Sequence, residues 1–254
     1  MSSMWEEQGS RGANAIPSPL MTSALKTLGA VFAAALAVFA YAGFHPGLGL
    51  AAPVAAATAL FCIYALVLGG LRHHPHPRLG AANLVTAIRA AMVCLAGATI
   101  LLADNIATSD QILWGLAALT AAALLLDGVD GYLARRNGES SVLGARFDME
   151  TDALLVLILS AAAYILGKAG LWVLAIGLMR YGFMLAQMLL PRLRGSLSPS
   201  FRRQLICVVQ VGALCGLLLP FIVPPFSNLI AAGALCLLTY SFAVDVRALW
   251  KGKA

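Results

Sequence analysis

The sequence predicts an all-α membrane protein, a polytopic bundle of eight transmembrane helices. Of its 254 residues, 61% are hydrophobic and only 11% are charged, and the mean hydropathy is +0.87. Soluble domains carry about 25% charged residues, so this composition excludes a soluble protein. The apolar residues also gather in runs separated by short polar turns. These runs are long enough to span a bilayer, which takes about 20 helical residues.

The runs divide the chain into four regions. Residues 1–23 are polar and small, so we expect a flexible cytoplasmic tail. Residues 24–71 hold two additional transmembrane helices, and residues 72–82 form a polar linker. The first run resembles a signal peptide, but the long acidic segment before it favours an uncleaved helix. The remaining runs predict a six-helix unit within residues 83–254, and they cover 84–103, 111–134, 148–167, 171–190, 204–221 and 227–246.

The basic residues predict the orientation of the helices in the membrane. With the N-terminus inside, fourteen Lys and Arg residues fall on the inner side and only Lys168 falls on the outer side. This bias follows the positive-inside rule and places both termini in the cytoplasm. The net charge of +6 therefore indicates cytoplasmic loops, and we expect no nucleic-acid partner.

Two arginines, Arg89 and Arg180, lie inside apolar runs. A charge near the bilayer centre costs about 3 kcal/mol on insertion scales, and such residues usually face an interior cavity. Arg89 is close enough to the end of its run to reach the membrane surface by snorkelling. Arg180 lies in the middle of its run, so it is the better candidate for a functional residue.

Six of the eleven acidic residues fall within residues 127–152, between two apolar runs. Asp127 and Asp130 share a face at the end of one predicted helix, and Asp148 and Asp152 share a face on the first turns of the next. Two carboxylates about 5 Å apart repel by roughly 3 kcal/mol at an effective dielectric of 20. A divalent cation would offset this repulsion, and ligands that are all oxygen favour Mg²⁺, Mn²⁺ or Ca²⁺.

Small residues accompany these carboxylates. Gly131 and Ala134 continue the face of Asp127, and Gly144 precedes Asp148 by one turn. They leave room for a ligand to approach the helix backbone. Metal ions at a helix N-terminus, with arginines beside them, form a site for phosphate groups. At a membrane surface this predicts a substrate with one end in lipid and a phosphorylated end in water.

The segment resembles the signature of the CDP-alcohol phosphatidyltransferases at every fixed position. It reads Asp127-x2-Asp130-Gly131-x2-Ala134-Arg135-x8-Gly144-x3-Asp148-x3-Asp152. A weaker feature of many members, Asn83-x2-Thr86-x2-Arg89, begins the preceding predicted helix. The resemblance covers roughly residues 80–250 and leaves the first two helices outside.

The resemblance implies the donor half of a reaction. Two Mg²⁺ or Mn²⁺ ions would be held by Asp127, Asp130, Asp148 and Asp152, and Asp152 would also act as general base. The residues expected to bind the CDP group are Gly131, Ala134, Arg135, Gly144, Asn83 and Thr86. The enzyme would move a phosphatidyl group from a CDP-linked lipid such as CDP-diacylglycerol to an alcohol and release CMP. It would work as a homodimer in a bacterial-type cytoplasmic membrane, with its active site facing the cytoplasm.

The acceptor alcohol is less well defined. In related enzymes a basic group helps to bind a phosphorylated acceptor of the glycerol phosphate or inositol phosphate type. Arg180, Arg202 and Arg203 are the candidates for this role, and ordinary positive-inside charge is the alternative for the last two. Met149 and Ala153 depart from the pattern of many phosphatidylglycerophosphate synthases, which argues against glycerol 3-phosphate as the acceptor.

Two other functions use clustered aspartates. An intramembrane prenyltransferase also holds a metal-bound diphosphate, but its two clusters lie much further apart in the chain. A divalent-cation transporter would place its ion site near the bilayer midplane. The aspartates of this chain are expected at helix ends on one side of the membrane, which favours the phosphatidyltransferase.

Overall fold

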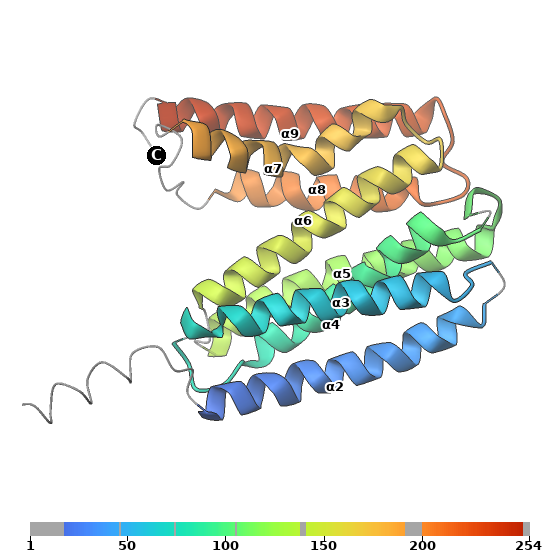
Figure 1. Cartoon of the computed structure of the whole chain (residues 1–254). Coiled ribbons are helices and arrows are strands. Elements are labelled where there is room, and N and C mark those ends of the chain that lie inside the picture. The colour runs from blue at the N-terminus through green and yellow to red at the C-terminus, as the bar shows by residue number, and fades with distance from the viewer. Residues whose placement is uncertain are drawn as a thin grey trace, which may run out of the picture. The chain divides into compact units, whose positions relative to one another are not determined.

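The computed structural model describes residues 18–45, 47–73, 75–104, 106–137, 141–190 and 200–250. Within these residues the chain is helical and contains no strand. The long helices are α2 (Ser18–Gly43), α3 (Ala51–Gly70), α4 (Ala81–Leu102), α5 (Asp110–Asn137), α6 (Val142–Ile165), α7 (Leu174–Leu189), α8 (Phe201–Leu217) and α9 (Phe226–Trp250). This confirms the predicted all-α helical bundle (Figure 1).

Six of these helices are long and apolar enough to cross a membrane, which makes the chain an integral membrane protein. They are α2, α3, α4, α5, α9 and α7 with the short 3₁₀ turn before it. The sequence predicts eight spans, but α6 and α8 do not combine the length and the apolar composition that a span requires. The first half of α6 carries several charged side chains. Helix α8 has 17 residues, or about 25 Å of length.

Several helices extend beyond the apolar runs that predict them. Helix α2 already begins at Ser18, and residues 1–17 of the expected tail lie outside the described residues. Helix α6 begins at Val142, so Asp148 lies beyond its first turn, where the sequence had placed it at the start. The Ser141 hydroxyl caps α6 by accepting the Gly144 backbone N–H at 3.0 Å. Hydropathy marks only the apolar part of a helix, whereas backbone hydrogen bonding continues into its polar ends.

The chain divides into two compact units, residues 1–98 with 125–151 and residues 99–124 with 152–254. Helices α4, α5 and α6 each contribute a part to both units. The first unit contains α2, α3, most of α4, the end of α5 and the start of α6. The second contains the other parts of these three helices, with α7, α8 and α9.

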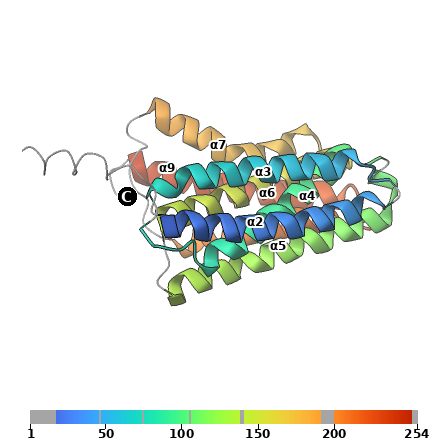
Figure 2. The same ribbon diagram turned by 60° about the horizontal axis from the view of Figure 1, so that its bottom comes forward.

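In the first unit the two additional helices form a pair. Helices α2 and α3 run side by side in both views (Figures 1 and 2). The buried face of α3 repeats every three or four residues and includes Ala52, Ala56, Leu60 and Tyr64. Alanines on this face allow close helix approach. The Tyr64 hydroxyl donates a buried hydrogen bond of 2.9 Å to the Ala87 carbonyl of α4, so the pair is fastened to the helix that follows it.

In the second unit, α9 packs against both α7 and α8. Helix α7 also lies close to α6, because a Cβ on Gly177 would fall 2.7 Å from Leu157 Cα and 2.5 Å from Ser160 Oγ. No larger residue fits at this contact without moving the α6 backbone. The glycine therefore sets the distance between the two helices.

A buried lysine connects two loops of the second unit through hydrogen bonds. Lys168 follows α6 and is only 6% exposed, and its ammonium group points toward a neighbouring loop. It donates to three carbonyls beyond α8, those of Leu219 at 3.2 Å, Pro220 at 3.3 Å and Ile222 at 2.6 Å. The Ser227 hydroxyl in turn donates to the Lys168 carbonyl. Burial lowers the pKa of this ammonium group, and the carboxylate of Asp110 acts in the opposite direction.

Replacing Lys168 with Met should destabilise the protein, because three carbonyls lose a charged donor. We expect the free energy of unfolding to fall by about 2 kcal/mol, since hydrogen bonds to charged groups contribute on this scale. Thermal unfolding in detergent measures the effect. Lys26→Met, at an exposed position of α2, is the matched control and should unfold like the wild type. A Lys168→Met protein of wild-type stability would show that the three bonds contribute nothing net.

Candidate active site

Helix α4 presents a buried polar face at intervals of three residues. Asn83, Thr86 and Arg89 are 4%, 2% and 1% exposed. The Asn83 amide donates to the Leu79 carbonyl one turn earlier. The Thr86 hydroxyl lies 3.0 Å from Asp130 Oδ2. Buried polar groups are costly unless they are hydrogen-bonded, so this face requires partners from the neighbouring helices.

Arg89 provides the main connection between α4 and the carboxylates. Its Nη2 lies 2.8 Å from Asp127 Oδ1, and its Nη1 lies 2.7 Å from Asp130 Oδ2 and 2.5 Å from Asp148 Oδ1. The snorkelling expected for Arg89 is wrong, since its side chain is enclosed among acidic groups and does not extend to the surface. Sequence reasoning noted Arg89 at the end of the Asn83-x2-Thr86-x2-Arg89 feature but gave it no role, and it preferred Arg180 as the functional arginine.

Asp130 is the most enclosed of the four aspartates, with 3% of the residue exposed. Its Oδ2 is approached by Arg89 and Thr86, and its Oδ1 accepts the backbone N–H of Gly131 at 2.7 Å. Both carboxylate oxygens of Asp130 therefore have protein donors as partners. Its assignment as a metal ligand stays a prediction.

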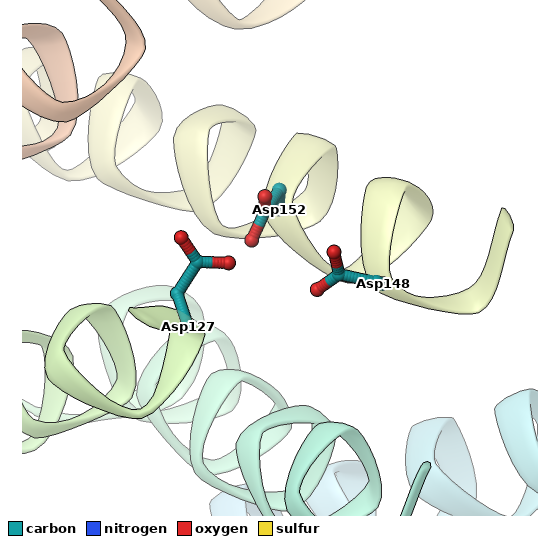
Figure 3. A group of neighbouring side chains, drawn as sticks. All are labelled: Asp127, Asp148 and Asp152. Atoms are coloured by element: carbon teal, nitrogen blue, oxygen red, sulfur yellow. The ribbon is translucent and has the colours of Figure 1, made fainter. Parts of the chain in front are cut away.

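The other three aspartates converge (Figure 3). Asp127 from α5 and Asp148 and Asp152 from α6 each offer one oxygen, and these oxygens all lie within 4.8 Å of one another. All three are half-buried. Asp152 follows Asp148 by about one helical turn, so both carboxylates lie on the same side of α6.

The donor set suits a hard divalent cation. Oxygens bound to one octahedral Mg²⁺ at about 2.1 Å lie at most about 4.2 Å apart. A span of 4.8 Å needs only small side-chain rotations to reach that geometry. Carboxylates without sulfur or imidazole favour Mg²⁺ or Mn²⁺ over zinc. These residues therefore fit the predicted metal ions.

A cavity of about 180 Å³ opens beside the carboxylates, between α4, α5 and α6. It is lined by Ala82, Asn83, Thr86, Asp130, Gly131, Ala134, Arg135, Ser141, Gly144, Ala145 and Asp148. The six residues expected to bind the CDP group are all among them. Sequence reasoning missed Ala82 and Ala145, which adjoin Asn83 and Gly144 in the chain, and Ser141, the cap of α6.

Gly144 is needed for the close packing that forms one wall of this cavity. A Cβ at this position would fall 2.7 Å from Asn83 Oδ1 and 3.1 Å from Ser141 Oγ. Asn83 is buried and held by its bond to Leu79, so it has little freedom to move away. At Gly131 the nearest atom to a Cβ is Arg135 Nη1 at 3.5 Å, an ordinary contact. Protein packing alone thus explains glycine at 144, whereas at 131 a glycine leaves room toward the cavity.

Two of the arginines predicted to bind the acceptor share a carboxylate in the second unit. Arg202 Nη2 lies 2.5 Å from Asp245 Oδ1, and Arg203 Nη1 lies 3.6 Å from Asp245 Oδ2. Arg202 Nη1 also donates to the Ser241 carbonyl at 3.0 Å. Asp245, on α9, is 8% exposed and was missed by sequence reasoning. Arg180 lies half-buried on α7.

A comparison with protein-family models matches residues 79–244 to the CDP-alcohol phosphatidyltransferase family. This match covers α4 through most of α9 and includes every residue of the carboxylate group and the cavity. The chain therefore belongs to the CDP-alcohol phosphatidyltransferase family, a class of membrane phosphotransferases that use CDP-alcohol donors, alcohol acceptors and divalent metal ions. Comparisons with curated proteins and with solved structures found no match.

Replacing Gly144 with Ala should narrow the cavity and force Asn83 to move. Overpacking of this kind costs about 1–3 kcal/mol, so we expect a lower unfolding temperature and weaker binding of CDP. Thermal unfolding and CDP titration measure the two effects. Gly128→Ala on α5 is the matched control, because a Cβ there meets no atom within 4 Å. If both variants bind CDP like the wild type, Gly144 does not shape the donor site.

Proposed function

We propose that the protein transfers a phosphatidyl group from CDP-diacylglycerol, or a similar CDP-linked lipid, to the hydroxyl group of a small alcohol and releases CMP. The observation that carries this proposal is the cavity between α4, α5 and α6. It gathers all six residues expected to bind CDP next to the carboxylates expected to bind metal. Family membership favours this reaction over the prenyltransferase and cation-transporter alternatives.

The cavity residues divide the work of binding the donor. Gly131, Ala134 and Gly144 present backbone and small side chains to the cytidine nucleotide, and Asn83 and Thr86 supply polar groups on the facing helix. The Arg135 guanidinium pairs with a phosphate of the donor, a contact for which its planar fork is well suited. The donor's acyl chains extend into the lipid, since the first unit belongs to an integral membrane protein.

The aspartates hold the metal ions and move a proton. Asp127, Asp130, Asp148 and Asp152 would bind two Mg²⁺ or Mn²⁺ ions. When bound, such ions neutralise the diphosphate and stabilise the charge that develops on the departing CMP. Asp152 accepts the proton of the acceptor hydroxyl while the hydroxyl oxygen attacks the phosphorus that bears the diacylglycerol. The new P–O bond forms, the bond to the CMP oxygen breaks, and CMP leaves with the electron pair.

The acceptor site is assigned to Arg202, Arg203 and Arg180. The acceptor is a small alcohol or its phosphate, and a phosphate would compete with Asp245 for the two paired arginines. The positive-inside bias supports a cytoplasmic active site and cytoplasmic termini. The bacterial-type inner membrane stays a prediction. The homodimer stays a prediction from the family resemblance.

Release of CMP tests the reaction directly. Membranes containing the protein, given CDP-diacylglycerol, Mg²⁺ or Mn²⁺ and a panel of alcohols and alcohol phosphates, should release CMP with at least one acceptor. Asp152→Asn should lower kcat by about 100-fold or more, because general base catalysis contributes on that scale. Chelation with EDTA should abolish the activity. Absence of CMP with every acceptor, or full activity of Asp152→Asn, would refute the proposed reaction.

Kinetics of Arg203→Ala test the acceptor site. With the acceptor that the panel identifies, this variant should raise the KM for the acceptor by about tenfold, as expected for a charge-assisted contact worth about 1.5 kcal/mol. The KM for CDP-diacylglycerol should change little. Arg72→Gln, at an exposed position in the linker, serves as the control for a general loss of positive charge. Equal increases in both KM values would remove Arg203 from the acceptor site.

A further inference from the structure

The Arg89 guanidinium occupies the centre of the carboxylate group. It joins α4 to Asp127 and Asp130 of α5 and to Asp148 of α6 through nitrogen–oxygen distances of 2.5 to 2.8 Å. The arginine is 1% exposed, so hydration does not compensate its charge. A buried charge is costly unless it is paired in good geometry. The three carboxylates therefore stabilise Arg89, and Arg89 in turn reduces the repulsion among them.

The three partners differ in how easily they exchange Arg89 for another cation. The Asp130 side chain is 4% exposed, whereas those of Asp127 and Asp148 are 31% and 37% exposed. Asp130 is also held by Thr86 and by the Gly131 N–H. Asp127 and Asp148, by contrast, belong to the group that converges with Asp152 as a set of metal ligands. Asp130 thus holds Arg89 through Oδ2 in the most enclosed of the three pairs, whereas Asp127 and Asp148 hold it through more exposed carboxylates that converge with Asp152.

We propose that Arg89 is a positioning residue that acts as a built-in counter-ion of the metal site. Before a metal binds, it draws the carboxylates of α5 and α6 together. When a divalent ion binds, Asp127 and Asp148 would pass from Arg89 to the ion, while Asp130 Oδ2 would keep Arg89 in place and leave Oδ1 as the oxygen that can serve the ion. Arg89 therefore competes with the metal and sets its affinity. This inference rests on the proposed function, because it takes the carboxylates to be ligands of a divalent ion.

Two substitutions separate the charge of Arg89 from its shape. Arg89→Gln removes the positive charge and so removes the competitor. Arg89→Lys keeps the charge but offers a single nitrogen, which cannot span three carboxylates as a guanidinium fork does. Arg72→Gln is the matched control, because Arg72 is exposed in the linker between α3 and α4.

The experiment uses the full chain in detergent without substrate, with Mn²⁺ as the probe. Mn²⁺ binding is titrated by electron paramagnetic resonance, and thermal unfolding is followed in EDTA and in saturating Mn²⁺. We expect Arg89→Gln to unfold at a lower temperature than the wild type in EDTA. Saturating Mn²⁺ should reduce this difference in unfolding temperature. The Mn²⁺ affinity of this variant should be about tenfold higher, because a competing positive charge is gone. Arg89→Lys should lose stability in EDTA and keep an Mn²⁺ affinity close to that of the wild type.

Mn²⁺ binding by Arg89→Gln that is equal to or weaker than that of the wild type would overturn the proposal. So would a difference in unfolding temperature that is the same with and without Mn²⁺, which is the result for a purely structural arginine. If Arg89→Gln cannot be recovered folded, even when Mn²⁺ is present throughout purification, Arg89→Lys takes its place. Its unfolding temperature is then compared with that of the wild type in EDTA and in saturating Mn²⁺, and an equal difference in the two conditions would overturn the proposal. Since no substrate is present, failure here is separate from failure to release CMP. A wild type that releases CMP while Arg89→Gln gains no Mn²⁺ affinity would refute only this inference.

Discussion

The ion pairs of Arg89 are the interaction on which the carboxylate group and the cavity beside it depend. A single pair about 4 Å apart contributes about 4 kcal/mol at an effective dielectric of 20, and removing a guanidinium from water costs several kcal/mol. One pair would therefore do little more than break even. Three carboxylates around one guanidinium shift the balance, and they do so by bringing α4, α5 and α6 to one place. The cavity lies between these helices, so its walls follow from the same interaction.

The two additional helices lie outside the family match, which begins at residue 79. They nevertheless contact helices that line the cavity. Tyr64 of α3 donates to the Ala87 carbonyl, two residues before Arg89 on α4. At the end of α3, a Cβ on Gly70 would meet Leu143 of α6 at 2.7 Å. These contacts support α4 and the start of α6 from the side of the α2–α3 pair.

In the second unit the arrangement is reversed, because two arginines share one buried carboxylate. Arg202 and Arg203 lie near the start of α8, where the helix dipole disfavours positive charge, and they are held by the buried carboxylate of Asp245. A phosphorylated acceptor would offer the same geometry as this carboxylate and would have to replace it. Selectivity for the acceptor would then depend on how tightly Asp245 retains its two arginines.

The family resemblance implied that Asn83, Thr86 and Arg135 belong with the site. Hydropathy and spacing alone predicted the helices and the small residues Gly131, Ala134 and Gly144 beside the aspartates, because the composition of a lipid-facing helix and the i, i+3 and i+4 relations are local properties. They misplaced the start of α6, where a serine cap and charged residues extend the helix past its apolar run. They also gave no role to Arg89 and missed Asp245. Each of these has partners distant in the chain: Arg89 pairs with residues on α5 and α6, and Asp245 with residues on α8. The sequence by itself determined the helices, and it is the source of the predicted CDP-binding and metal-binding residues. Only the tertiary structure decided that a buried arginine pairs with three of the predicted metal ligands, because an ion pair depends on distances that folding sets.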